Sequence, residues 1–162
     1  MGKLRVYVDA SVFGGYFDDE FAAGTKPFFE AILAGRATAL ISDTLVDELR
    51  SAPDQVRALL HRVMARPYEH LPVRPETLAL RNAYLRAGVL APKWADDALH
   101  VAHAVTARAD VIVSWNFKHL VNPRRIRGFS GVDVAEGFGP VVIMTPADVA
   151  GGLEDGNDET EA

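Results

Sequence analysis

The stretch LRVYVDAS, residues 4–11, is a run of strand-forming side chains that an aspartate closes. Val and Tyr favour extended backbone, so these residues predict a short strand that ends at Asp9. The runs ATALIS (37–42) and DVIVS (110–114) have the same character, and HLPV (70–73) and PVVIMT (140–145) are weaker candidates. Apolar periodicity between these runs predicts helices over residues 44–51, 54–65, 75–88 and 96–109. Near-continuously apolar strands that alternate with helices are typical of a parallel sheet covered on both faces, so we expect one α/β domain.

Several details follow from local signals. A helical region is expected from Ser11, with a break near Gly24 and a new start after Pro27. Thr44 is placed to cap the helix that follows residues 37–42. The segment after residues 110–114 reads as an irregular basic loop, and residues 146–152 as a short helix.

Composition limits the kind of protein. The chain has 162 residues, 49% of them hydrophobic, which suits a single domain over residues 1–150. No apolar run approaches the length of a membrane span, and the N-terminus lacks the apolar region of a signal peptide, so we expect a cytoplasmic protein with no membrane association. Cysteine is absent, which excludes disulfides and thiolate zinc sites. Residues 151–162 carry five of the 22 acidic residues and no basic residue, and we interpret them as a disordered tail.

Four polar residues are expected at one edge of the sheet. Asp9 ends the first strand, Glu48 lies early in the helix after the second, and Asn116 follows the strand at residues 110–114. Asp97 begins a helix that must run antiparallel to its strand, so it returns to the same edge. An acid in the first turn of a helix is common because it interacts favourably with the helix dipole. Three convergent carboxylates, however, repel one another unless a cation neutralises them, and oxygen ligands favour Mg²⁺ or Mn²⁺.

Four segments together resemble the PIN-domain family of metal-dependent ribonucleases, in particular the branch of VapC-like toxins of toxin–antitoxin pairs. They are VYVDASVFGGYF (6–17), SDTLVDEL (42–49), DDALHVAHA (96–104) and DVIVSWNFKHLVN (110–122). The resemblance implies a three-layer α/β/α sandwich with a central parallel sheet. It also implies an RNA substrate, a cognate antitoxin protein as partner, and a homodimer.

The resemblance also implies roles for individual residues. Asp9, Glu48 and Asp97 match the family's three acids, which hold Mg²⁺ or Mn²⁺ and make the site catalytic. Asp97 is preferred to Asp96 because the family's acid directly precedes an Ala-Leu pair, which leaves Asp96 at the cap position. Asn116 stands where many PIN domains have a fourth acid, and there we expect it to orient water.

Further residues are candidates for binding nucleic acid, although an ordinary solvated basic segment is an equally good interpretation. They are Ser11, which matches a hydroxyl residue of the family, and the basic residues Lys118, Arg124, Arg125 and Arg127.

Three other interpretations of the sequence remain open. His100 and His103 lie three apart on the helix that Asp97 begins, which is compatible with a zinc hydrolase, although a packed histidine is the commoner case. An Asp-Ala-Ser strand end also occurs in enzymes with a phosphorylated aspartate, but these usually have a second acid where Ser11 stands. Finally, a chain with Asn116 in the fourth position is compatible with a catalytically weak or inactive module that binds nucleic acid or a protein partner.

Overall fold

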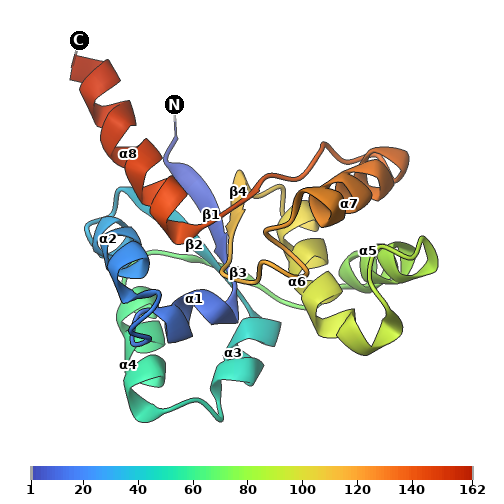
Figure 1. The fold of residues 1–162 in the computed structure, drawn as a ribbon, viewed down its shortest axis with the longest axis horizontal. Coiled ribbons are helices and arrows are strands. Elements are labelled where there is room, and N and C mark those ends of the chain that lie inside the picture. The colour runs from blue at the N-terminus through green and yellow to red at the C-terminus, as the bar shows by residue number, and fades with distance from the viewer. Residues whose placement is uncertain (1, 162) are drawn as a thin grey trace.

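The computed structural model describes the backbone of residues 2–161 and the side chains of residues 2–154. Five strands and eight α-helices, with one short 3₁₀ helix, follow one another along the described chain (Figure 1). In chain order they are β1 (Leu4–Val8), α1 (Ala10–Gly15), α2 (Ala22–Leu33), β2 (Ala37–Ser42), α3 (Asp43–Leu49), α4 (Asp54–Met64), β3 (Glu69–Leu71), α5 (Pro75–Arg86), η1 (Pro92–Trp94), α6 (Ala95–Thr106), β4 (Val111–Val113), α7 (Pro123–Ala135), β5 (Ile143–Met144) and α8 (Pro146–Glu161).

The five strands form one sheet in the order β3-β2-β1-β4-β5, and every pair is parallel. β1 is the central strand, with Val6 opposite Ala39 of β2 on one side and opposite Val111 of β4 on the other. All strands therefore end at the same edge, which is the arrangement that the sequence predicted.

Side chains that alternate along β1 serve two separate hydrophobic cores. Val6 and Val8 pack with the apolar residues of α1 to α4 and α8, whereas Tyr7 packs with those of α5, α6 and α7. Figure 1 shows these two groups of helices on opposite faces of the sheet. The architecture is a three-layer α/β/α sandwich.

The expected break near Gly24 and Pro27 is wrong, because both residues lie inside α2. Proline lacks the N–H that would donate to the carbonyl of the preceding turn, which normally weakens a helix. Here Phe28, Phe29 and Ile32 are at most 3% exposed, and their burial holds the helix against the first core.

The segment expected to be an irregular basic loop contains helix α7. Asn122 caps it by accepting hydrogen bonds from the backbone N–H groups of Arg124 and Arg125, and Pro123 occupies the first helical position. Asn followed by Pro is a recognisable helix start, so the signal was present in the sequence and was outweighed by the high charge of the segment.

A buried acid links α7 to α5. Asp133 is fully buried, and the Tyr84 hydroxyl donates to its Oδ1. Within the described side chains, Asp133 Oδ2 is a buried atom without a hydrogen-bond partner. Burial raises the pKa of Asp133 from 3.8 to about 6, although the bond from Tyr84 acts in the opposite direction. This carboxyl group is therefore costly to ionise.

Helix α8 packs against α2 through its first turns, where Val149 and Ala150 are buried. The helix is drawn to Glu161, and the expectation that residues 151–162 form a disordered tail stays a prediction. The side chains of residues 155–162 lie outside the described residues, and the domain boundary at residue 150 stays a prediction. No helix in the described part of the chain is long and apolar enough to cross a bilayer.

Candidate active site at the carboxyl edge of the sheet

Asp9 is held rigidly where β1 ends. Its backbone N–H donates to the carbonyl of Val113 (3.2 Å), which extends the pairing with β4 by one residue. Its side chain caps α1: Oδ1 accepts from the N–H of Ala10 (2.8 Å), and Oδ2 accepts from the hydroxyls of Ser11 (2.8 Å) and Ser114 (2.7 Å). These donors stabilise the carboxylate although it is only 5% exposed.

Glu48 is positioned by a buried histidine. His100 of α6, 1% exposed, donates from Nε2 to Glu48 Oε1 at 2.9 Å, and the same nitrogen lies 3.9 Å from Asp9 Oδ1. The other ring nitrogen is 2.6 Å from the Tyr7 hydroxyl, which in turn is 2.8 Å from Ser42 Oγ. A chain of hydrogen bonds therefore connects β1, β2, α3 and α6 beneath the acids.

The beginning of α3 explains this placement. Ser42, the last residue of β2, caps α3 by accepting from the N–H of Leu45 at 3.0 Å. The expectation that Thr44 is the cap is wrong, because α3 begins one residue after Ser42, at Asp43. Glu48 lies in the last turn of α3, where it contacts His100.

Asp97 lies in the first turn of α6 with Asp96, and the cap position is occupied by Trp94. The expectation that Asp96 is the cap is therefore wrong; its side chain is exposed. Asp97 Oδ2 accepts from His119 Nδ1 at 2.7 Å and from the Asn116 amide at 3.3 Å. The two neighbouring acids thus have different environments, and only Asp97 faces the loop after β4.

The three acids converge electrostatically on His100. Burial by itself lowers the pKa of His100, but the hydrogen bond to Glu48 and the charges of Asp9, Glu48 and Asp97 together raise it above its ordinary value. Within the described residues, however, no group of three or more His, Asp and Glu side chains is arranged to hold a metal ion. Each of the three carboxylates accepts at least one hydrogen bond from a protein group.

The two histidines of α6 do not form a zinc site with Asp97. His103 is 1% exposed, its Nε2 lies 2.9 Å from the hydroxyl of Thr44, and its ring stacks near Tyr7. Burial lowers the pKa of His103 to about 4, with a further contribution from His100. His103 is therefore a neutral, packed residue, which is the commoner interpretation that the sequence analysis left open.

The predicted nucleic-acid contacts are dispersed. The Ser11 hydroxyl faces inward, where it donates to Asp9 and accepts from the N–H of Trp115. Arg125 is half-buried and donates to the carbonyl of Val89 at 2.7 Å. Lys118 is exposed in the loop after β4, and Arg124 and Arg127 are exposed on α7. Their proposed roles in binding nucleic acid stay predictions.

Sequence reasoning missed two residues that contact the acids directly. His119 contacts Asp97, and Ser114 contacts Asp9. Asn116 Oδ1 accepts a hydrogen bond from the N–H of His119, three residues later, which forms a turn after β4. An asparagine just after a strand favours such a turn, so this residue was the one signal in the sequence that could have pointed to His119. The bond from Ser114 depends on the register of β4 beside β1, which short-range patterns do not specify.

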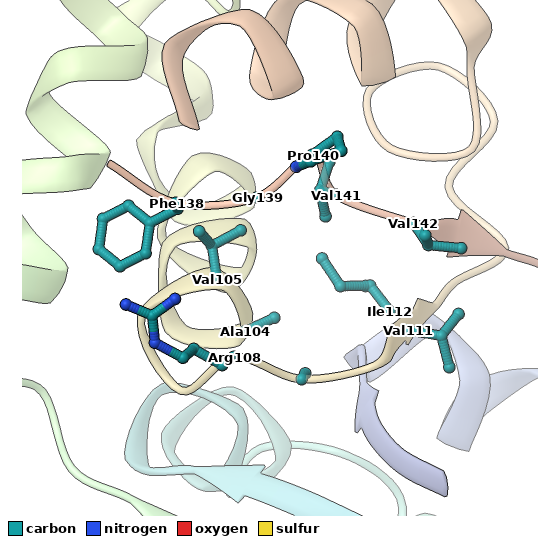
Figure 2. Close-up of a pocket in the computed structure, with 11 residues that line it drawn as sticks. Ala104, Val105, Arg108, Val111, Ile112, Phe138, Gly139, Pro140, Val141 and Val142 are labelled. Atoms are coloured by element: carbon teal, nitrogen blue, oxygen red, sulfur yellow. The ribbon is translucent and has the colours of Figure 1, made fainter. Parts of the chain in front are cut away.

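A cavity of about 210 Å³ lies at the other end of α6, away from the acids (Figure 2). The side chains that line it are apolar except for Arg108, whose guanidinium lies over the Phe138 ring, 5.4 Å from the centroid. At 1.5 Å per residue, Ala104 in this lining is about 10 Å along the helix from Asp97. The cavity is therefore separate from the candidate active site.

Comparison with known proteins shows the fold. No protein-family model matches the chain, and no curated protein sequence matches it. Among solved structures, the chain is similar to a chain in the crystal structure of VapBC2 from Rickettsia felis bound to a DNA fragment from their promoter. The alignment covers 88% of this chain and 98% of that chain, with 15% sequence identity and a TM-score of 0.52. The predicted PIN-like α/β/α fold is confirmed.

Proposed function

We propose that the chain is a Mg²⁺- or Mn²⁺-dependent endoribonuclease of the PIN family and the VapC-like toxin of a toxin–antitoxin pair. One observation carries this proposal: Asp9, Glu48 and Asp97 reach one edge of the sheet from three separate elements, where Glu48 and Asp9 lie 2.9 and 3.9 Å from Nε2 of the buried His100 and Asp97 contacts the loop after β4. A role in capping helices would not by itself bring these acids together at one edge of the sheet. The fold likeness to a chain of the VapBC2 structure supports the family.

The donor set fits a hard divalent cation. All three candidate ligands are carboxylates, the oxygen donors that Mg²⁺ and Mn²⁺ prefer. Asp97 Oδ1 and Glu48 Oε2 make no hydrogen bond with the described residues, so each group keeps an oxygen for an ion. Asp9 keeps spare acceptor capacity, because a carboxylate has about four lone-pair positions and three are engaged.

The residues of the chain then have distinct tasks. Asp9, Glu48 and Asp97 would hold the ion, which would supply Lewis-acid chemistry to the phosphodiester and would lower the pKa of water. His100 fixes the orientation of Glu48, and His119 fixes that of Asp97, so neither ligand has to be ordered when substrate arrives. We assign to the Asn116 amide, which lies beside Asp97, the orientation of the attacking water. The expected products carry a 5′-phosphate and a 3′-hydroxyl.

The partners follow from the family. We propose a cognate antitoxin protein, a homodimer, and action on RNA in the cytoplasm. The proposal of an antitoxin is supported by the similarity to a chain of VapBC2, which is bound to a DNA fragment from its promoter.

The test is cleavage of a panel of structured RNAs with Mg²⁺, Mn²⁺, Zn²⁺ or EDTA, with the ends of the products identified. We expect cleavage with Mg²⁺ and Mn²⁺ only. Asp97→Ala should abolish it, and Asp96→Ala, a matched change on the same helix turn, should keep most of it. Equal loss from both substitutions contradicts the assignment of Asp97.

A non-catalytic module that binds nucleic acid or a protein partner is the second candidate. The observation in its favour is that each of the three carboxylates is tied to a protein partner, and that no metal-binding group is formed among the described residues. In the same assay this candidate predicts RNA binding without cleavage in any metal.

A further inference from the structure

We propose that Trp94, with Lys93 and Lys118, forms a subsite for one unpaired nucleotide beside the acids, with the base stacked on the indole and its phosphates held by the two lysines. This inference rests on the proposed function, because it names the form of nucleic acid that the same site accepts. Of its residues, Lys118 was already a candidate for binding nucleic acid, whereas Trp94 and Lys93 were not.

Trp94 lies at the start of α6, next to the candidate active site. It caps α6 three residues before Asp97, and its ring centroid lies 4.5 Å from that of His119. His119 is itself hydrogen-bonded to Asp97 at 2.7 Å. The indole is only partly buried against the second core, so part of it remains open to solvent. A base stacked on it would therefore be connected to Asp97, a proposed metal ligand, through Trp94 and His119.

Two lysines from separate segments converge on this ring. Lys93 Nζ lies over the Trp94 ring, 5.1 Å from its centroid, and Lys118 Nζ lies over it at 5.4 Å, so each makes a cation–π contact with the indole. A base that stacks on this ring has to displace these ammonium groups from it, toward the phosphates of the nucleotide. Lys93 belongs to η1, whereas Lys118 follows β4. Both are exposed, and neither makes a salt bridge with a described residue. Their charges are therefore available to a ligand.

The charge of the site explains why such a pair is needed. Three carboxylates repel a polyanion, and an exposed positive charge acts only over about 8–10 Å at physiological salt. Lys93 and Lys118 contact the ring that lies against His119, the hydrogen-bond partner of Asp97, so they offset that repulsion for phosphates bound beside Trp94. Stacking on an aromatic side chain needs the face of an unpaired base, so the subsite selects single-stranded segments over duplex.

The binding experiment uses full-length protein in EDTA, which prevents metal-dependent cleavage, and a fluorescein-labelled single-stranded RNA oligonucleotide of mixed sequence. Trp94→Ala should weaken binding roughly 5- to 150-fold, because stacking contributes about 1–3 kcal/mol per base. Trp94→Phe keeps an aromatic face and should retain most of the affinity. Lys93→Ala and Lys118→Ala should each reduce the slope of log affinity against log salt by about 0.7.

Tryptophan fluorescence supplies a direct signature, because the chain has only two tryptophans. RNA should quench the emission of the wild type, and this quenching should disappear in Trp94→Phe although that variant still binds. Phe138→Ala and Arg108→Ala are matched controls, since they remove a similar cation–aromatic pair at the far end of α6 and should change neither affinity nor quenching.

The outcomes separate this inference from the function on which it rests. The subsite is refuted if Trp94→Ala binds RNA as tightly as the wild type. It is also refuted if Trp94→Phe loses as much affinity as Trp94→Ala, because the loss would then come from disturbed packing against His119 and not from a missing aromatic face. In cleavage with Mn²⁺, Trp94→Ala should raise KM with little change in kcat, and an unchanged KM also refutes the subsite. A wild type that binds RNA but cleaves none with any metal refutes the nuclease and leaves the subsite standing.

Discussion

Replacing Asp97 by Asn should remove the stabilisation of the protein by divalent metal, whereas replacing Asp96 by Asn should leave it intact. Both acids lie in the first turn of α6, so each substitution loses the same interaction with the helix dipole, about 0.3–1 kcal/mol. At a hundredfold excess over its Kd, a metal ion stabilises the folded state by about 2.7 kcal/mol. For a chain of 162 residues this is a rise in Tm of roughly 5–10 °C.

In EDTA the two variants should melt close to the wild type. Asp97→Asn weakens the bond from His119, and a hydrogen bond to a charged group exceeds a neutral one by about 1 kcal/mol. It also relieves repulsion from the other two acids, so these effects oppose each other. The assay is thermal unfolding of the three proteins in EDTA and in Mn²⁺. The reasoning is refuted if the wild type shows no metal-dependent shift, or if Asp96→Asn loses as much of the shift as Asp97→Asn.

Three further predictions concern stability. Because the pKa of Asp133 is raised to about 6, the free energy of unfolding of the wild type should fall as pH rises from 4 to 6. Between pH 4 and pH 8, the stability of Asp133→Asn relative to the wild type should therefore rise by up to about 3 kcal/mol, measured by urea unfolding. The pKa of His103 is lowered to about 4, so the free energy of unfolding of the wild type should fall by up to about 3 kcal/mol as pH falls from 6.5 to 4. In the same titration His103→Gln should not show this fall. Identical pH profiles for the two proteins would contradict the prediction. Gly15→Ala should destabilise the protein by about 1–3 kcal/mol, because the new Cβ would lie 2.8 Å from the Trp115 ring. Gly14→Ala on the same helix meets no atom within 4 Å and should stabilise the protein slightly. Equal melting temperatures of the two variants would refute the predicted clash.

The parallel sheet and the convergence of the acids were predictable because both follow from apolar runs and chain direction. Asp9 and Asp97 needed only the rule that parallel strands end at one edge. Pro27 was misread because local propensity argues for a break, whereas burial of the neighbouring phenylalanines decides the outcome. The environments of Asp96 and Asp97 differ through His119, which reaches α6 from a loop more than twenty residues away. Contacts of that range are set by packing, and no local pattern contains them.

The central position of β1 has a consequence for synthesis. The strand is synthesised before the other four strands, yet one of the hydroxyls that hold Asp9 belongs to Ser114, 105 positions later. Translation at about 5–20 residues per second takes roughly 6–20 s to reach that point. Until α6, β4 and Asn116 have emerged, a nascent chain has β1 and β2 but lacks His100 and Asp97 beside them. Any activity of this site therefore begins only after α6 and β4 have been synthesised.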